Sequence, residues 1–232
     1  MSKVIAFVTY ESPWFPAGGI AAVMGQVPSA VQSAGGFPTV VITPFHEKAA
    51  KIAVLKMQGI GTIQMAYDLT PVSVEVLHYT ADCPWFFLKV DDSVNLKPVF
   101  FDGDRHPYSV ANELLLRDSL FFGAATVQAL PIIAKHLKVD LNEVEWNLIA
   151  QDWEAATGVL AFASQNNSHG RLHLTLRNSY DEFATSADFS RVGINPASCP
   201  GDTILHRALS VIEPPAFTVS GKHRGQVLFL AF

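Results

Sequence analysis

The sequence predicts an α/β protein with a doubly wound, mostly parallel sheet. Two observations carry this prediction. Short runs that are apolar throughout recur along the chain, as in strands that are buried on both faces of a parallel sheet. Segments of helical composition alternate with these runs. The 232 residues are enough to bury a core without disulfide or metal support, and we expect one domain spanning 1–232.

The first quarter of the chain predicts strand, helix, strand. Residues 4–10 form an apolar run that ends in a turn rich in proline and glycine. Residues 20–34 have helical composition, but Pro28 predicts a kink or a late start, and two glycines at 35–36 end the helix. Residues 38–45 form a second buried strand.

The next segment changes character. A polar connection with some helix potential, 46–59, leads to runs that suggest short strands at 60–65, 73–80, 85–90 and 98–101. We therefore expect a short antiparallel excursion around 60–102, inserted in the α/β frame. The second half returns to alternation, with helices at 110–137 (bent by Pro131), 154–163 and 204–212 and strands at 144–150, 172–176 and 216–220.

Composition excludes several classes of protein. A hydrophobic share of 49% with only 16% charged residues excludes a disordered chain. The net charge of −5 and the lack of a basic run argue against a nucleic-acid surface. No uninterrupted apolar run of about 18 residues is present, so no membrane-spanning helix is expected. The N-terminus is typical of a strand rather than a signal peptide, and two cysteines fit a reducing cytoplasm, where we expect the protein.

Candidate ligand residues follow three of the predicted strands, because open α/β sheets bind ligands at the carboxyl ends of their strands. Gly18 and Gly19 precede a helix and could expose backbone N–H groups to an anion, or form an ordinary turn. Asp152 could cap a helix or contact a ligand. Arg177 could bind a phosphate or carboxylate, or simply be solvated.

Four stretches in register resemble the N-terminal half of glycogen and starch synthases, nucleotide-sugar glycosyltransferases with two Rossmann domains (the GT-B fold). They are the opening strand, Gly-Gly loop and helix of 4–23, Phe-Asp-Gly-Asp-Arg-His-Pro-Tyr at 101–108, Gln-Asp-Trp-Glu at 151–154 and Leu-Arg-Asn at 176–178. The family's counterparts of the last two are His-Asp-Trp-Gln and Ile-His-Asn. The resemblance spans nearly the whole chain and implies a Rossmann-like half of a GT-B fold.

The resemblance also implies roles for eight residues. Binding of the donor diphosphate falls to Gly18, Gly19, Arg177 and Asn178, the catalytic positions to Asp152 and Gln151, and the acceptor side to Tyr108 and Trp153. Trp14, beside the glycine loop, is a further acceptor-side candidate, whose ring could stack on a sugar. The implied donor is ADP-glucose or UDP-glucose, the acceptor is a glucan or another saccharide, and no metal or other cofactor is expected. The implied reaction is glycosyl transfer with retention of configuration.

The departures from the family pattern leave two hypotheses open. The loop lysine is replaced by Pro16, an acidic residue by Ala22, and the histidines of two motifs by Gln151 and Arg177. Glutamine can hydrogen-bond a hydroxyl but cannot carry a proton or a charge. The site is either retuned to another donor, or the domain is degenerate and binds glucan or a partner subunit without turnover.

The second Rossmann domain of such enzymes is absent from this sequence, which ends at Phe232. We therefore expect a fragment of a longer gene product or a truncated paralogue, with little or no activity by itself. We also expect an exposed apolar face where the other domain would pack, and self-association through it.

Overall fold

The computed structural model describes residues 2–46, 49–90, 100–101, 112–165, 169–177, 180–214 and 216–218. These residues form one eight-stranded sheet in the order β3-β4-β5-β2-β1-β6-β7-β8. The strands are β1 (Ser2–Val8), β2 (Thr39–Pro44), β3 (Gln58–Tyr67), β4 (Thr70–Tyr79), β5 (Trp85–Val90), β6 (Val144–Gln151), β7 (Gly170–Leu176) and β8 (Phe217–Thr218). The α-helices are α1 (Gly19–Met24), α2 (Val27–Gly35), α3 (Ala50–Ala53), α4 (Asn112–Leu137), α5 (Asp152–Ala163), α6 (Ser186–Arg191) and α7 (Ile204–Leu209). The predicted α/β class is confirmed.

Six neighbouring strands, from β5 to β8 in the sheet order, are parallel. Strand β1 lies in the middle, and its Ile5 pairs with Thr39 of β2 on one side and Asn147 of β6 on the other. From β1 the chain first adds the strands on the β2 side of the sheet and later those on the β6 side. Such a point of reversal opens a crevice at the carboxyl ends of the strands.

The excursion predicted around 60–102 is antiparallel, but it extends the main sheet. Strands β3 and β4 form an antiparallel hairpin, and β4 pairs antiparallel with β5, which in turn pairs parallel with β2. The hairpin turns through Asp68 and Leu69, both with positive φ (46° and 65°), the geometry that suits tightly twisted strands. The strand expected at 98–101 is wrong for Phe100 and Phe101, which lie outside any strand; residues 98 and 99 lie outside the described part.

The helices follow the proline and glycine signals. Pro28 lies in the first turn of a second helix, α2, which begins at Val27, instead of kinking one long helix, because proline is tolerated in a first turn. Gly36 ends α2 in the left-handed conformation with φ 66°. Pro131 lies inside α4, which continues to Leu137.

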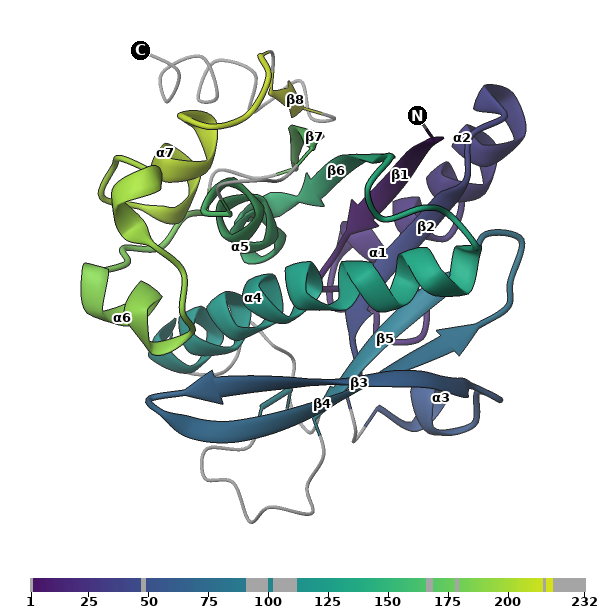
Figure 1. The fold of residues 1–232 in the computed structure, drawn as a ribbon, viewed down its shortest axis with the longest axis horizontal. Coiled ribbons are helices and arrows are strands. Elements are labelled where there is room, and N and C mark those ends of the chain that lie inside the picture. The colour runs from purple at the N-terminus through teal and green to yellow at the C-terminus, as the bar shows by residue number, and fades with distance from the viewer. Residues whose placement is uncertain are drawn as a thin grey trace.

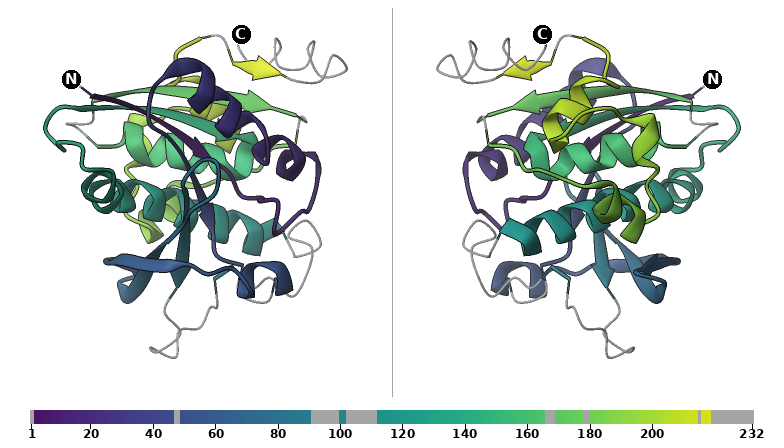
Figure 2. Two further views of the ribbon diagram at one scale, coloured as in Figure 1. Left: turned by 90° about the vertical axis from the view of Figure 1, so that its right-hand side faces the viewer. Right: turned by 90° about the vertical axis from the view of Figure 1, so that its left-hand side faces the viewer.

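The two faces of the sheet carry separate apolar cores, and Figures 1 and 2 show helices on both sides of the strands. Alternation along β1 divides its side chains, with Val4, Ala6 and Val8 in the core beneath α4 and α5. Phe7 faces the smaller core, together with Ile20 of α1. This is the two-sided burial that the apolar runs predict.

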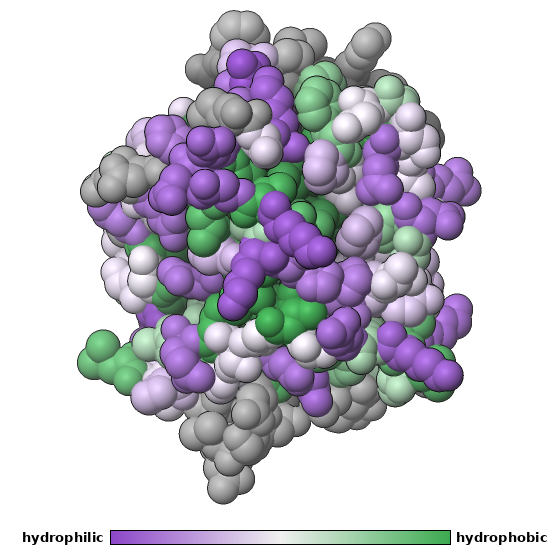
Figure 3. Space-filling model, turned by 45° about the vertical axis from the view of Figure 1, so that its right-hand side comes forward, coloured by the Kyte–Doolittle hydropathy of each residue, from purple (hydrophilic) through white to green (hydrophobic). Residues whose placement is uncertain are grey.

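Helix α4 is long and apolar enough over Leu114–Leu137 to cross a membrane by length and composition alone, which the sequence did not lead us to expect. However, 67% of that window is buried against the rest of the protein, so α4 is best described as a core helix. Hydrophobic residues also reach the surface: on the face shown in Figure 3 they gather in hollows between hydrophilic ones.

Candidate functional site

Four of the predicted site residues come together at the carboxyl ends of β1, β6 and β7. Gly18 and Gly19 lie in the loop after β1, Asp152 follows β6 directly, and Arg177 follows β7. The Arg177 side chain donates from Nη1 to the Gly19 carbonyl at 3.2 Å. The Arg177 backbone N–H donates to Asp152 Oδ1 at 2.6 Å. The topological switch at β1 therefore gathers residues that lie more than a hundred positions apart in the chain.

Asp152 stands where β6 turns into α5 without a loop. Its φ of 58° is left-handed, a conformation that costs energy for a residue with a Cβ and that aspartate tolerates better than most. Gln151 is the N-cap of α5 and makes no side-chain capping hydrogen bond. Capping of α5 and contact with a ligand are the two roles predicted for Asp152. In the structure its carboxylate accepts a hydrogen bond from the backbone at the end of β7, which connects the start of α5 to the end of β7.

A carboxylate that the sequence analysis did not single out occupies the glycine loop. Glu11 Oε2 accepts hydrogen bonds from the backbone N–H of Gly18 at 2.6 Å and of Ala17 at 3.1 Å. A Cβ added at Gly18 would lie 3.0 Å from Glu11 Oε1, so the close approach of this carboxylate favours glycine here. Successive N–H groups of this kind bind anions, and in this structure the anion is the protein's own. The sequence feature that could have indicated this role is the position of Glu11, three residues after the buried strand β1 and just before the glycine loop.

The Arg177 guanidinium has hydrogen-bonding capacity left. Its Nε and Nη2 atoms are buried and have no hydrogen-bond partner among the residues that the structure describes, while Nη1 is engaged with Gly19. Nε and one terminal nitrogen form the fork with which arginine grips two oxygens of a phosphate or carboxylate. An unpartnered charged donor pair is costly to bury, which is what a group that awaits an anionic ligand would show.

Buried acids beside this arginine change the electrostatics of the site. Glu154 is 2% exposed in the first turn of α5. Its pKa is raised from 4.5 to about 8, mainly by burial; a hydrogen bond from its own backbone N–H lowers the pKa, and the nearby carboxylates of Asp152 and Glu11 contribute to the rise. Glu154 therefore holds a proton at neutral pH. Tyr10, buried next to it, has its phenol pKa raised well above 10, first by burial and then by Asp118 and Glu154.

His46 packs beneath the loop after β1. It is buried, its Nε2 lies 3.0 Å from the Tyr10 carbonyl, and its ring stacks on Phe15 with centroids 3.7 Å apart. Burial lowers its pKa from 6.5 to about 4, while the bond to the Tyr10 carbonyl raises it. A neutral imidazole can donate this bond, so the loop after β1 is supported by an uncharged histidine.

The other predicted site residues that the structure describes lie in the apolar cores or beside Asp152. Trp153 is 5% exposed and belongs to the core beneath α4 and α5. Trp14 packs edge-on against Trp85 and Tyr79, with centroids 4.9 and 5.1 Å away, in the core on the other face. Both large apolar rings gain more from burial than an exposed stacking position would give them. Gln151 is buried next to Asp152, while Tyr108 and Asn178 lie outside the described residues.

Fold and site together define a class: a Rossmann-like α/β domain with its candidate ligand residues at the switch point of the sheet. Within that class the chain belongs to the starch synthase catalytic domain family, whose model matches residues 4–179. This confirms the family that the four motifs resemble.

Comparison with solved structures agrees on the fold. The catalytic domain of starch synthase IV from Arabidopsis thaliana, solved with ADP and acarbose bound, superposes with a TM-score of 0.70 at 14% sequence identity. The match covers 91% of this chain and 43% of that chain, so this chain spans less than half the length of the plant protein domain. No curated protein sequence matches the chain.

Proposed function

We propose that the chain is the acceptor-side half of a nucleotide-sugar glycosyltransferase. It would help to transfer glucose or a related sugar from ADP-glucose or UDP-glucose to an α-glucan or another saccharide, in the cytoplasm. Membership of the starch synthase catalytic domain family supports this proposal and favours an enzyme over a degenerate binding module. A second Rossmann domain would complete the cleft, as the 43% coverage of the plant enzyme suggests.

The observation that carries the proposal is the unpartnered fork of Arg177 beside the glycine loop. The family's loop lysine is proline here, and we assign the contact with the diphosphate to Arg177. Charge on the departing diphosphate rises during transfer, and a fixed guanidinium in a dry site stabilises such charge. Asp152, held by the Arg177 backbone, and the neighbouring Gln151 remain the predicted groups for the sugar hydroxyls.

Glu11 sets a condition on donor binding. A diphosphate that approached the loop would compete with the Glu11 carboxylate for the N–H groups of Ala17 and Gly18. Like charges disfavour both anions at one place. We therefore expect this chain alone to bind nucleotide sugars weakly, at millimolar affinity at best.

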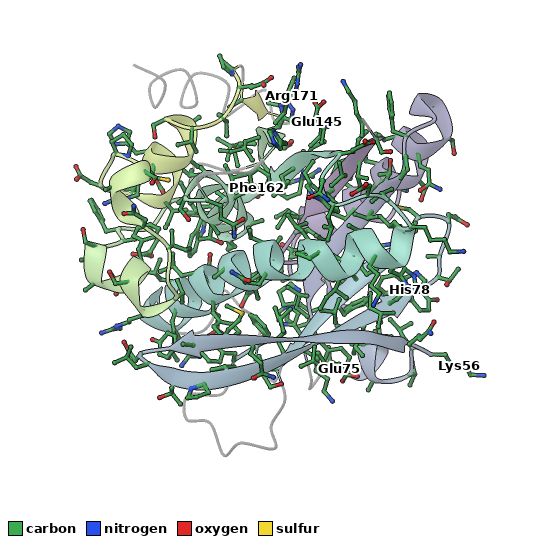
Figure 4. All side chains as sticks on the ribbon, in the orientation of Figure 1. Lys56, Glu75, His78, Glu145, Phe162 and Arg171 are labelled. Atoms are coloured by element: carbon green, nitrogen blue, oxygen red, sulfur yellow. The ribbon has the colours of Figure 1, made fainter. Side chains whose placement is uncertain are left out.

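Titration calorimetry with ADP-glucose and UDP-glucose tests the proposal. Arg177→Ala should weaken binding about ten- to hundredfold, because one charge-assisted contact is lost. Glu11→Gln should tighten it by removing the competing charge. The matched control is Arg171→Ala on the same strand: Arg171 lies near Glu145 at the opposite end of β7 and pairs with it at 3.3 Å (Figure 4).

Two results would refute the assignment of the phosphate site. One is micromolar affinity for a sugar nucleotide that Arg177→Ala leaves unchanged. The other is an equal loss of affinity in Arg171→Ala and Arg177→Ala, which would indicate a general effect of charge and no specific contact.

A further inference from the structure

Two histidines outside the candidate site described above lie against each other. His78 is near the end of β4, and His136 is in the last turn of α4. Their ring centroids are 4.3 Å apart and their ring planes are inclined by 52°. Figure 4 shows His78 next to the C-terminal end of α4. The fold therefore brings together two imidazoles from elements that are far apart in the sequence.

This histidine pair lies at the opposite edge of the sheet from the candidate transfer site. His78 pairs with Phe86 near the start of β5, a strand that runs parallel to β2. The candidate transfer site is at the carboxyl ends of β1, β6 and β7, and the start of a parallel strand points the other way. A ligand of the histidine pair would therefore not touch the groups proposed for sugar transfer.

One side of the histidine pair is apolar, and the other is open to solvent. The buried ring of Phe86 lies beside both imidazoles, with its centroid 5.3 Å from that of His78 and 5.8 Å from that of His136. Gln58, which is opposite His78 in the β3–β4 ladder, is exposed. Both imidazoles are half-buried, so packing holds them on one side while a small ion can reach them from the other.

The nitrogens of both rings are available to a ligand. Neither imidazole makes a hydrogen bond to another residue that the structure describes. Burial lowers the pKa of His78 below its usual 6.5, and the neighbouring His136 lowers it further. His78 is therefore uncharged at neutral pH. An uncharged imidazole nitrogen is a common ligand of zinc, copper and nickel ions.

The separation of the two rings is close to that of two imidazoles on one metal ion. A Zn–N bond of about 2.1 Å puts each ring centroid about 3.2 Å from the metal, so two adjacent ligands have centroids about 5 Å apart. The observed 4.3 Å differs from this by less than about 1 Å, which small rotations of two half-buried side chains can supply.

The end of α4 adds a field that favours a cation. The carbonyl groups of the last turn form the negative end of the helix dipole, and His136 stands in that turn. Lys138, with φ 59°, ends the helix by donating its backbone N–H to the Lys135 carbonyl at 3.2 Å. The side chain of Lys135 is exposed, where solvent and salt screen its charge.

We propose that His78 and His136 form a two-histidine site for a divalent transition-metal ion of the Zn²⁺ class. The ion would join the end of α4 to β4 and so stabilise this corner of the fold. In the part of the chain that the structure describes, no cluster of three or more His, Cys, Asp or Glu side chains could hold a metal. Water would therefore complete the coordination, and the ion would exchange more readily than in a closed structural site.

Titration calorimetry with Zn²⁺ on the full, untagged chain tests this inference. The wild type should bind Zn²⁺, and His78→Gln and His136→Gln should each weaken that binding at least tenfold, because one imidazole remains in each variant. Saturating Zn²⁺ should also raise the Tm of the wild type by several degrees and leave the Tm of both variants unchanged. The matched control is His206→Gln on the surface of α7, which should bind Zn²⁺ like the wild type.

The other outcomes overturn the site. They are absence of Zn²⁺ binding at millimolar concentrations, binding that either His78→Gln or His136→Gln leaves unchanged, and an equal loss in His206→Gln. Circular dichroism checks that the variants fold, and a Zn²⁺-dependent rise in Tm that persists in both would place the ion elsewhere. Mg²⁺ prefers oxygen ligands and should not bind; binding of Mg²⁺ as tight as that of Zn²⁺ would also contradict an imidazole site.

Discussion

At the scale of single residues, the most consequential feature is a proton buried in the site. Glu154 occupies the position of the glutamine in the family's His-Asp-Trp-Gln motif, and within the described part of the chain its Oε2 has no hydrogen-bond partner. A protonated carboxyl has nearly the shape of a carboxamide and is likewise uncharged, with one O–H donor where the amide has two N–H donors. At neutral pH this chain therefore presents an uncharged group where its relatives carry an uncharged amide.

Replacement of this glutamate gives a pH-dependent prediction. The folded-state pKa of Glu154, about 8, lies above its usual 4.5, so the wild type loses stability as pH rises from 4.5 to 8. Glu154→Gln removes this loss. The variant should match the wild type near pH 4 and exceed its free energy of unfolding by about 3 kcal/mol at pH 7.

Urea unfolding of both proteins at several pH values measures this difference. Glu145→Gln is the matched control, because Glu145 pairs with Lys3 and Arg171 at the other end of the sheet. It should give no gain that grows with pH. A constant difference between wild type and Glu154→Gln across this range would contradict a buried, protonated Glu154.

The sequence predicted the site residues that follow strands or stand in a motif, and missed those defined by their surroundings. Gly18, Gly19, Asp152 and Arg177 come together because parallel strands end at one edge. The roles of Glu11 and Glu154 depend on burial and on neighbours distant in sequence, which no local pattern encodes. The acceptor-side role of Trp153 stays a prediction, and the structure places this side chain in the core, 5% exposed.

At the scale of elements, α4 and α5 are held together by small residues and hydroxyls. Ser119 donates to the Glu154 carbonyl at 2.7 Å, and Thr157 donates to the Ser119 carbonyl at 2.7 Å. A Cβ at Gly123 would lie 2.4 Å from the Thr157 carbonyl carbon. Backbone atoms cannot move aside as the end of a flexible side chain can, so α4 and α5 would have to separate to make room for the added Cβ.

Gly123→Ala should therefore destabilise the protein by about 2 kcal/mol or more, despite the better helix propensity of alanine. Denaturant unfolding measures the loss. Gly35→Ala, at the end of α2, is the control: its Cβ would meet only the Phe37 side chain at 3.5 Å, and stability should be unchanged or rise by up to about 1 kcal/mol. Equal effects of the two substitutions would show that the α4–α5 contact tolerates more space than its geometry indicates.

Elements with strong local signals were predictable, and their assembly was not. The strands β1 and β2 could be predicted because their runs are largely apolar, β6 because buried apolar residues alternate along it, and α2 because proline and glycine mark its ends. The hairpin of β3 and β4 was expected as an insertion. Its place at the edge of the main sheet depends on β5 pairing with β2, a contact between segments about 45 positions apart.

At the scale of the whole molecule, one sheet joins two cores, and each core contains two of the four tryptophans. Trp146 and Trp153 lie beneath α4 and α5, whereas Trp14 and Trp85 lie on the other face. Because both cores share the strands that separate them, neither face can unfold while the other keeps its sheet. We therefore expect a single cooperative transition for the one predicted domain.

Paired tryptophan variants test this expectation directly. In Trp14→Phe/Trp85→Phe the fluorescence reports the core under α4 and α5, and in Trp146→Phe/Trp153→Phe it reports the opposite core. Both variants lose stability, so the comparison is made within each protein, between fluorescence and far-ultraviolet circular dichroism in urea. The two signals should give one midpoint and one slope in each variant. A fluorescence midpoint that precedes the circular dichroism midpoint in one variant would mean that its core opens first and that the two faces of the sheet are separate folding units.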